Sequence, residues 1–110
     1  MIRIVIAAFV AFLASGVAAE TAALPIRFSH HASERLEERH IQKVWVEHVV
    51  HMPDWTEPDP QHKLSVHLAF GRIAEAQGQI LHVVYADVDG AELVITEFFD
   101  RAAAKRAPFR

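Results

Sequence analysis

The sequence predicts an α+β fold in which two N-terminal helices pack on a three- to four-stranded antiparallel sheet, followed by a short C-terminal helix. Three observations lead to this prediction. Apolar residues recur at helical spacing between residues 29 and 52, and apolar and polar residues alternate further along the chain. Between two segments rich in β-branched residues stands an Asp-Gly pair at Asp89, which is typical of a β-hairpin.

Both predicted helices have clear boundaries. Ser29 is a good N-cap for a helix that runs to about His40. A second helix is expected from about Gln42 to His51, because Pro53 cannot continue it. One face of this second helix is apolar and should pack on the sheet; it consists of Ile41, Trp45, Val49 and Met52.

The predicted strands follow a polar segment at residues 54–62, whose prolines favour a loop. Alternation from Leu64 to Phe70 predicts one half-buried strand, and residues 80–87 and 92–99 predict two more around the hairpin turn. Residues 26–28 form a short strand or an arm, and Asp100 can cap a final helix to Lys105. The expected core consists of Leu36, Trp45, Val49, Leu68, Phe70, Val83, Tyr85 and Ile95.

The N-terminal segment has the layout of a secretory signal peptide over residues 1–19. Arg3 precedes an apolar run from Ile4 to Leu13, and Val17 and Ala19 are the small residues expected before a cleavage site. The run is shorter than the ~20 residues that span a bilayer, so no stable membrane span is expected after cleavage. A retained anchor, or a core helix of a cytoplasmic protein, is the alternative. Export would place the mature chain in the periplasm or outside the cell.

With 110 residues, the chain has room for one domain. We expect it over residues 26–106, after a lead-in at residues 20–25 and before a tail at residues 107–110. The net charge of -3 argues against a nucleic-acid partner, because phosphate binding usually needs a basic surface. The absence of cysteine excludes disulfides, thiolate metal sites and thiol catalysis.

No pattern in the sequence predicts a cofactor or a metal. The chain has only four glycines and no glycine-rich phosphate loop. His48 and His51 lie three residues apart with Glu47 in front, whereas a zinc-protease helix needs histidines four apart with the glutamate between them. Two histidines without a third ligand would bind Zn²⁺ weakly. We therefore expect neither cofactor nor metal.

The best candidate for chemistry is a stripe of His31, Arg35 and Arg39 at four-residue spacing on the first helix. An imidazole beside two guanidinium groups can move a proton and bind a phosphate, provided that a cation from the sheet, Arg72 or Arg101, converges on the same place. The alternative is that the arginines form surface ion pairs with nearby glutamates, which are common and individually weak.

Two histidines on adjacent predicted strands, His67 and His82, form a second possibility. They would make a polar patch if the strand register brought them side by side. Because a slip of one residue moves a side chain to the other face, the sequence leaves this open. Two separate surface histidines are the alternative.

Several segments of the chain, in order, resemble domain-of-unknown-function family 4258. The resemblance begins at Phe28-Ser29-His30-His31-Ala32 and continues through Arg35-Leu36, Arg39 and Ile41, Pro53-Asp54-Trp55, Phe70 to Ile73, Leu81 to Tyr85, and Val94 to Arg101. That family is similar in layout to the small RelE-like and BrnT-like ribonuclease toxins, which also place helices before an antiparallel sheet. The resemblance thus implies the predicted fold and a possible link to RNA cleavage, although fold does not determine function.

Three features depart from that pattern: the signal peptide, the acidic balance and His82 where an arginine is expected. We therefore expect a small exported domain, either non-catalytic or an inactive toxin-like module. Its partner would be an antitoxin-like or envelope protein. The alternative is a RelE/BrnT-like endoribonuclease of a toxin-antitoxin pair, and only under that alternative is RNA a partner. Metal buffering by the histidines is a weaker third hypothesis.

Overall fold

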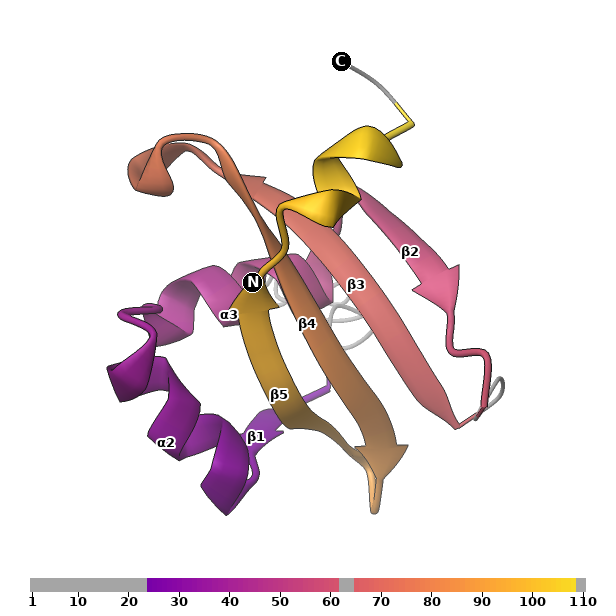
Figure 1. Ribbon diagram of the computed structural model, residues 1–110. Coiled ribbons are helices and arrows are strands. Elements are labelled where there is room, and N and C mark those ends of the chain that lie inside the picture. Colours follow the sequence, from indigo (N-terminus) through magenta and orange to yellow (C-terminus); the bar gives the residue numbers. More distant parts are fainter. Residues whose placement is uncertain (1–23, 62–64, 109–110) are drawn as a thin grey trace, which may run out of the picture.

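The computed structural model describes residues 24–61 and 65–108, and the predicted signal peptide lies outside them. These described residues fold into a five-stranded sheet with two α-helices and two short 3₁₀ turns (Figure 1). The elements in chain order are β1 (Ile26–Phe28), α2 (His30–Glu38), α3 (Lys43–His51), β2 (Trp55–Pro58), β3 (Val66–Ile73), the turn η1 (Ala74–Ala76), β4 (Gln79–Val88), β5 (Ala91–Phe99) and the turn η2 (Ala102–Lys105).

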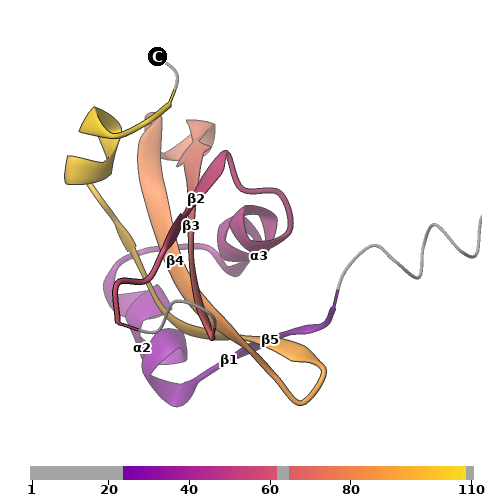
Figure 2. The same cartoon turned by 90° about the vertical axis from the view of Figure 1, so that its right-hand side faces the viewer.

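The strands lie in the order β1-β5-β4-β3-β2. β2, β3, β4 and β5 pair antiparallel with their neighbours, whereas β1 pairs parallel with β5. The β4–β5 hairpin turns at Asp89 and Gly90, both with positive φ, as the Asp-Gly pair predicts. The sheet is twisted; α3 packs on one face of it, and η2 lies over the opposite face (Figure 2).

Local sequence accounts for the helix boundaries. The Ser29 hydroxyl accepts a hydrogen bond from the backbone N–H of Ala32 at 3.0 Å, which confirms the predicted N-cap. The same hydroxyl donates to the carbonyl of Ile95 at 3.2 Å and so ties the start of α2 to β5. α2 ends at Glu38, and His40 has a positive φ that helical backbone does not adopt. α3 ends at His51, before Pro53.

The main hydrophobic core lies between the helices and the sheet. It contains buried residues of α2, α3 and the three central strands, among them Ala32, Val46, Val49, Leu81, Val83 and Val94. Trp45 is half-buried there and packs against Phe99, with ring centroids 6.2 Å apart. A smaller cluster of Phe70, Ile80 and Ala103 lies on the opposite face, beneath η2. Of the eight expected core residues, Val49, Phe70 and Val83 are fully buried, and the other five are half-buried.

The predicted fold layout is wrong in three respects, although the α+β class is correct. The sheet has five strands and is mixed, instead of three or four antiparallel strands. β1 precedes α2, so the helices do not both stand at the N-terminal end. The C-terminal segment is not an α-helix: Ala103, Ala104 and Arg106 each donate to the carbonyl three residues earlier, which makes it a 3₁₀ turn.

Each error has a physical reason. β2 lies in the segment that was predicted to be a loop because of its prolines. Trp55 nevertheless pairs with Phe70, and Pro58 is tolerated because β2 is an edge strand. β1 has only three residues, and its pairing with β5 joins segments more than sixty residues apart. Residues 102–105 are too few for a stable α-helix, and Pro108 follows them closely.

The close approach of α3 to β3 depends on Gly71. A Cβ atom at this position would lie 2.7 Å from Cγ2 of Val49, closer than atoms pack without displacement. We expect Gly71→Ala to destabilise the domain by ~1–3 kcal/mol, because β3 and α3 must move apart. The measurement is urea unfolding of Gly71→Ala, of Val49→Ala and of the double variant that carries both substitutions. The double variant should be more stable than the two separate losses predict. Strict additivity of the losses would contradict this account of the contact.

Candidate functional site

One face of the sheet, here called the open face, carries no α-helix within residues 24–61 and 65–108. Strand register determines which side chains lie on it. Phe70 of β3, His82 of β4 and Phe98 of β5 are direct neighbours across the three central strands. Directly opposed residues point to the same side of a sheet, so these three rings form a row. Because α2 and α3 pack on the other face, the row lies on the open face.

His82 stands at the centre of this row. Its ring centroid is 4.3 Å from that of Phe70 and 4.6 Å from that of Phe98. Its Nδ1 atom lies 3.1 Å from Oδ2 of Asp100, and since a carboxylate only accepts, Nδ1 carries the proton. Nε2 is buried and has no hydrogen-bond partner among the described residues. The imidazole is therefore oriented by Asp100, while its second nitrogen remains unpaired.

Burial decides the charge of His82. It lowers the pKa of the imidazole below the ordinary value of 6.5, and the favourable contact with Asp100 compensates only in part. The side chains of His82 and Asp100 are only 12% and 15% exposed. His82 is thus neutral at pH 7, and Nε2 carries the lone pair that a base or a ligand would use.

A network of hydrogen bonds and one longer ion pair extends from His82 toward the edge strand. Nε of Arg106 lies 3.0 Å from Oε2 of Glu57, and Nη2 of Arg106 lies 3.8 Å from Oδ2 of Asp100. The indole N–H of Trp55 donates to the same Glu57 oxygen at 3.0 Å. Although burial raises the pKa of Glu57, the hydrogen bonds from Trp55 and Arg106 outweigh it, and the pKa is lowered. Glu57 is therefore ionised and holds Arg106 in place.

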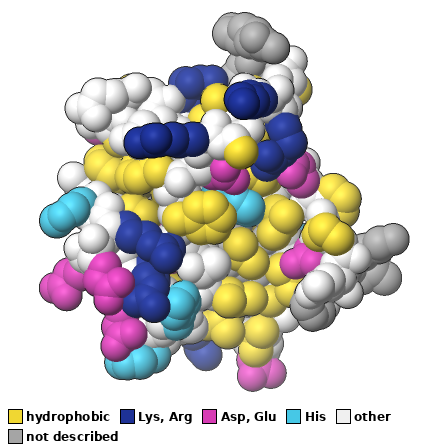
Figure 3. Space-filling model, in the orientation of Figure 1, with side chains coloured by type: hydrophobic (Ala, Val, Ile, Leu, Met, Phe, Trp, Pro, Cys, Tyr) yellow, Lys and Arg dark blue, Asp and Glu magenta, His cyan; other side chains and the backbone are white. Residues whose placement is uncertain are grey.

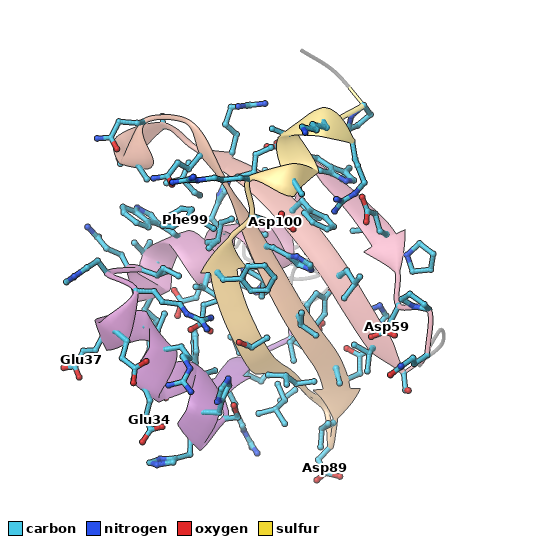
Figure 4. The ribbon with its side chains drawn as sticks, in the orientation of Figure 1. Glu34, Glu37, Asp59, Asp89, Phe99 and Asp100 are labelled. Carbon is cyan, nitrogen blue, oxygen red and sulfur yellow. The ribbon has the colours of Figure 1, made fainter. Side chains whose placement is uncertain are left out.

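Hydrophobic and basic side chains share the open face. The Trp55 and Phe70 rings stack with centroids 4.8 Å apart, and the Arg106 guanidinium lies 5.5 Å from the centroid of Phe70. Figure 3 shows that the centre of this face is hydrophobic, with Lys and Arg side chains gathered at the end that η2 covers. Figure 4 shows Asp100 at that same end, where β5 leads into η2. The site therefore combines aromatic rings, one oriented imidazole and nearby cations.

The predicted helix stripe does not converge on His82 as a unit. His31 is exposed on α2, and Nη1 of Arg35 pairs with Oε1 of Glu38 at 2.9 Å. Nη1 of Arg39 donates to the backbone carbonyl of Glu97 at 2.7 Å, and its guanidinium lies 6.0 Å from the centroid of the Phe98 ring. Of the three, Arg39 is the one whose contacts reach the row of rings. Catalytic roles for the stripe stay a prediction.

The two predicted cations of the sheet side share one cavity. Arg72 and Arg101 line a hollow of about 260 Å³ between the turn at Gly78 and η2, and Asp100 lines it as well. Nη1 of Arg72 already donates to the carbonyl of Gly78 at 2.9 Å. Both arginines are exposed, so they can reach solvent and ligands at this end of the sheet.

The two strand histidines lie on opposite faces. His82 opposes Phe70 on the open face, whereas His67 opposes Tyr85 on the helix side and stacks on it at 4.9 Å. His67 also lies 3.3 Å from Oδ2 of Asp87. The two imidazoles therefore form no common patch.

Sequence reasoning missed Glu57 and Arg106 and assigned Asp100 only a capping role. Asp100 does cap η2, since its Oδ1 accepts from the backbone N–H of Ala103 at 3.0 Å. Its other oxygen contacts His82. Glu57 and Arg106 are 49 residues apart in the chain, so no short motif could have joined them.

Glu97 is a second unusual group, beneath α2 on the helix side. Its side chain has no exposed surface, and neither carboxyl oxygen has a hydrogen-bond partner within the described part of the chain. Burial raises the pKa of Glu97 to about 7, despite the opposing positive charges of Arg39 and Arg35. Near neutral pH this carboxyl therefore exists in both protonation states.

Two further searches cover only residues 24–61 and 65–108. In these ranges no three His, Asp or Glu side chains are grouped closely enough to hold a metal ion. No helix in the same ranges has the length and apolarity needed to cross a membrane.

Comparison with known protein families gave one match. The model of a family described as "Domain of unknown function (DUF4258)" matches residues 28–98, which includes both helices and the row of rings. Comparisons with curated proteins and with solved structures found no match.

Glu97 makes stability depend on pH. The folded state keeps this proton up to about pH 7, whereas the unfolded state loses it near the ordinary value of 4.5. The free energy of unfolding therefore falls by ~3 kcal/mol in total, because of Glu97, as the pH rises between these two values. We expect Glu97→Gln to be more stable than wild type at about pH 8 and to lose most of that advantage at about pH 5.

The measurement is urea unfolding of wild type and Glu97→Gln at both pH values. Glu75→Gln, at an exposed position, is the matched control and should follow the wild type. His82 and Glu92 also titrate with shifted pKa values, but they are common to all three proteins. An advantage of Glu97→Gln that is the same at both pH values would argue against this titration.

Proposed function

Because the chain belongs to the DUF4258 family, whose description assigns no activity, we propose a function from the geometry of the open face. In this proposal the domain is an exported, non-catalytic binding module, that is, an inactive toxin-like module without ribonuclease activity. Its binding surface is the open face, and its partner is a protein, either an antitoxin-like protein or one of the cell envelope.

The observation that carries the proposal is the state of His82. A general base must present its lone pair to a substrate, but Nε2 of His82 is buried between two phenylalanine rings. A base held in this way stabilises the row of rings and does not contact a substrate. The Asp100 contact then serves to satisfy Nδ1 and to hold η2 against the sheet.

The arginines support the same conclusion. Phosphate chemistry requires several cations aimed at the same oxygens. Arg35, Arg39, Arg72 and Arg106 instead each donate to a group of this chain. Cations already engaged in this way must give up a contact before they bind a phosphate.

The remaining surface of the open face favours a protein partner. Its outward positions include Leu68, Val84 and Phe98, which are half-buried and apolar. An antiparallel sheet with one face in water normally carries polar residues there. Contiguous apolar surface on a small domain is a usual mark of a protein-binding site.

A ribonuclease remains the second candidate, and one observation favours it. His82 oriented by Asp100, with Arg106 near the same carboxylate and Arg39 beside Phe98, is the set of groups that metal-free RNA cleavage needs. In this candidate Nε2, buried in the structure, would have to become accessible to the substrate. RNA would then be the substrate, and the aromatic rings would stack on its bases.

The two candidates differ in what the mature chain does to RNA. We express the chain from Glu20 in bacterial cells and follow growth and RNA integrity for wild type, His82→Ala and Arg35→Ala. For a binding module we expect folded protein, normal growth and intact RNA in all cases. Loss of the Arg35 ion pair should cost at most ~1 kcal/mol, because Arg35 lies at the surface of α2.

Arg27→Ala, at an exposed position of β1, is the matched control for loss of an arginine. RNA cleavage by the wild type that persists in Arg27→Ala and disappears in His82→Ala would reject the binding module and establish the ribonuclease.

Export is tested separately. The basic start, apolar run and small residues before Glu20 lead us to expect cleavage between Ala19 and Glu20. Intact mass and N-terminal sequencing of the protein from its native cell measure this directly. A soluble protein that keeps Met1 would contradict export.

A further inference from the structure

The open face beyond η2 has no covering layer among the described residues. η2 covers only the end of the face that carries Phe70 and Ile80. The rest is an apolar patch on three strands, defined here as Val66, Leu68, Val84, Ala86, Leu93 and Phe98. All six are neither fully buried nor fully exposed, and Figure 3 shows a continuous hydrophobic field in this region. A second layer is needed to remove this surface from water.

Charge is distributed unevenly along the strands. At the end covered by η2, the exposed residues Arg101, Lys105 and Arg106 are basic. At the opposite end, the turn of the β4–β5 hairpin carries the exposed residue Asp89, whereas Asp87 faces the helix side beside His67. Figure 4 shows Asp89 at the tip of this hairpin, far along the sheet from Asp100. The patch therefore lies between a basic end and an acidic end.

We propose that a second copy of this chain covers the apolar patch, turned end for end. This inference rests on the proposed role of the open face as a binding surface, and it names a second copy, in place of an antitoxin-like or envelope protein, as the partner that covers the apolar patch. The two-fold axis lies in the interface and runs across the strands, so that each patch packs on the other and each η2 meets the partner's β4–β5 hairpin. The two sheets then stack as in a β-sandwich, ~10 Å apart.

Charge and shape both favour this arrangement over the alternative two-fold, whose axis runs along the strands. The end-for-end dimer brings Lys105 and Arg101 of each copy near Asp89 of the other, whereas the alternative brings like charges together. η2 also stands above the open face at one end of the sheet (Figure 2). In the alternative dimer the two η2 turns would meet and hold the patches apart.

The first test is the mass of the full chain by sedimentation velocity over a range of micromolar concentrations. We expect wild type to have the mass of two chains, and Val84→Lys, at the centre of the patch, to have the mass of one chain that still unfolds cooperatively on heating. Val44→Lys is the matched control, since Val44 is 59% exposed on α3, away from the open face. It should remain a dimer.

The second test exchanges charges between the two ends. Lys105→Glu and Asp89→Lys should each weaken the dimer, raising its Kd about fivefold or more, because each creates two like-charge contacts. An equimolar mixture should recover wild-type affinity, since Glu at 105 then faces Lys at 89 and the native Lys105 faces the native Asp89. Melting temperatures of both variants verify that each is folded.

Three results would overturn the proposal. They are a wild type that stays a single chain, a dimer that Val84→Lys leaves intact, and a mixture that does not recover affinity. All variants share residues 1–23. If the chains associated through that segment, the Val84→Lys variant would still have the mass of two chains. None of these outcomes bears on RNA cleavage, so a failed dimer and a failed binding-module proposal remain distinguishable.

Discussion

The register of the three central strands determines what the open face can do. Because Phe70, His82 and Phe98 oppose one another, an imidazole lies between two aromatic rings, within reach of the carboxylate that begins η2. A slip of one residue in β5 would exchange Phe98 for Glu97 and put a carboxyl group on the open face. A bulge between Val84 and Tyr85 shifts the pairing within the same hairpin. The two halves of β5 therefore pair with β4 in registers that differ by one residue.

The two faces of the β4–β5 pair hold titratable groups whose effects on stability have opposite signs. Glu97, beneath α2, favours low pH because its buried carboxyl is stable when protonated. His82, on the open face, favours high pH because its buried imidazole is stable when neutral. The domain is thus most stable where Glu97 is still largely protonated and His82 already neutral. Glu97 opposes Val83, the residue after His82, so the two groups lie on opposite faces of the paired strands because successive side chains alternate.

Local charge arrangement tells more about this domain than its net charge. The chain is acidic overall, yet η2 and the turn at Gly78 bring several arginines to one end of the sheet. Two of those arginines bind groups of the chain itself, which makes them structural: Arg72 donates to the carbonyl of Gly78, and Arg106 joins η2 to β2. Arg39, at the end of α2, ties that helix to β5 in the same way. The same contacts that complete the fold therefore remove cations from solvent. This is the physical basis for favouring a binding surface over a phosphate-cleaving site.

Local patterns in the sequence were sufficient for the α+β class, the Ser29 cap, the Asp89-Gly90 hairpin and the residues that characterise the family. Each of these depends on residues close together in the chain, such as a cap and the N–H three residues later. Local patterns could not predict which distant segments pair as strands. The pairing of β1 with β5, and of Trp55 with Phe70, depends on long-range contacts that no local pattern encodes.

The candidate site divides in the same way. The sequence by itself identified His82 and the arginines as residue types with chemistry, and it predicted a signal peptide. Only the tertiary structure decided that His82 meets Asp100, that Arg106 meets Glu57, and that Arg35 pairs on its own helix. The reason is that register and face are properties of packed strands. Alternation in the sequence shows that one face of a strand is buried, but only the assembled sheet determines which distant side chains lie together on the other face.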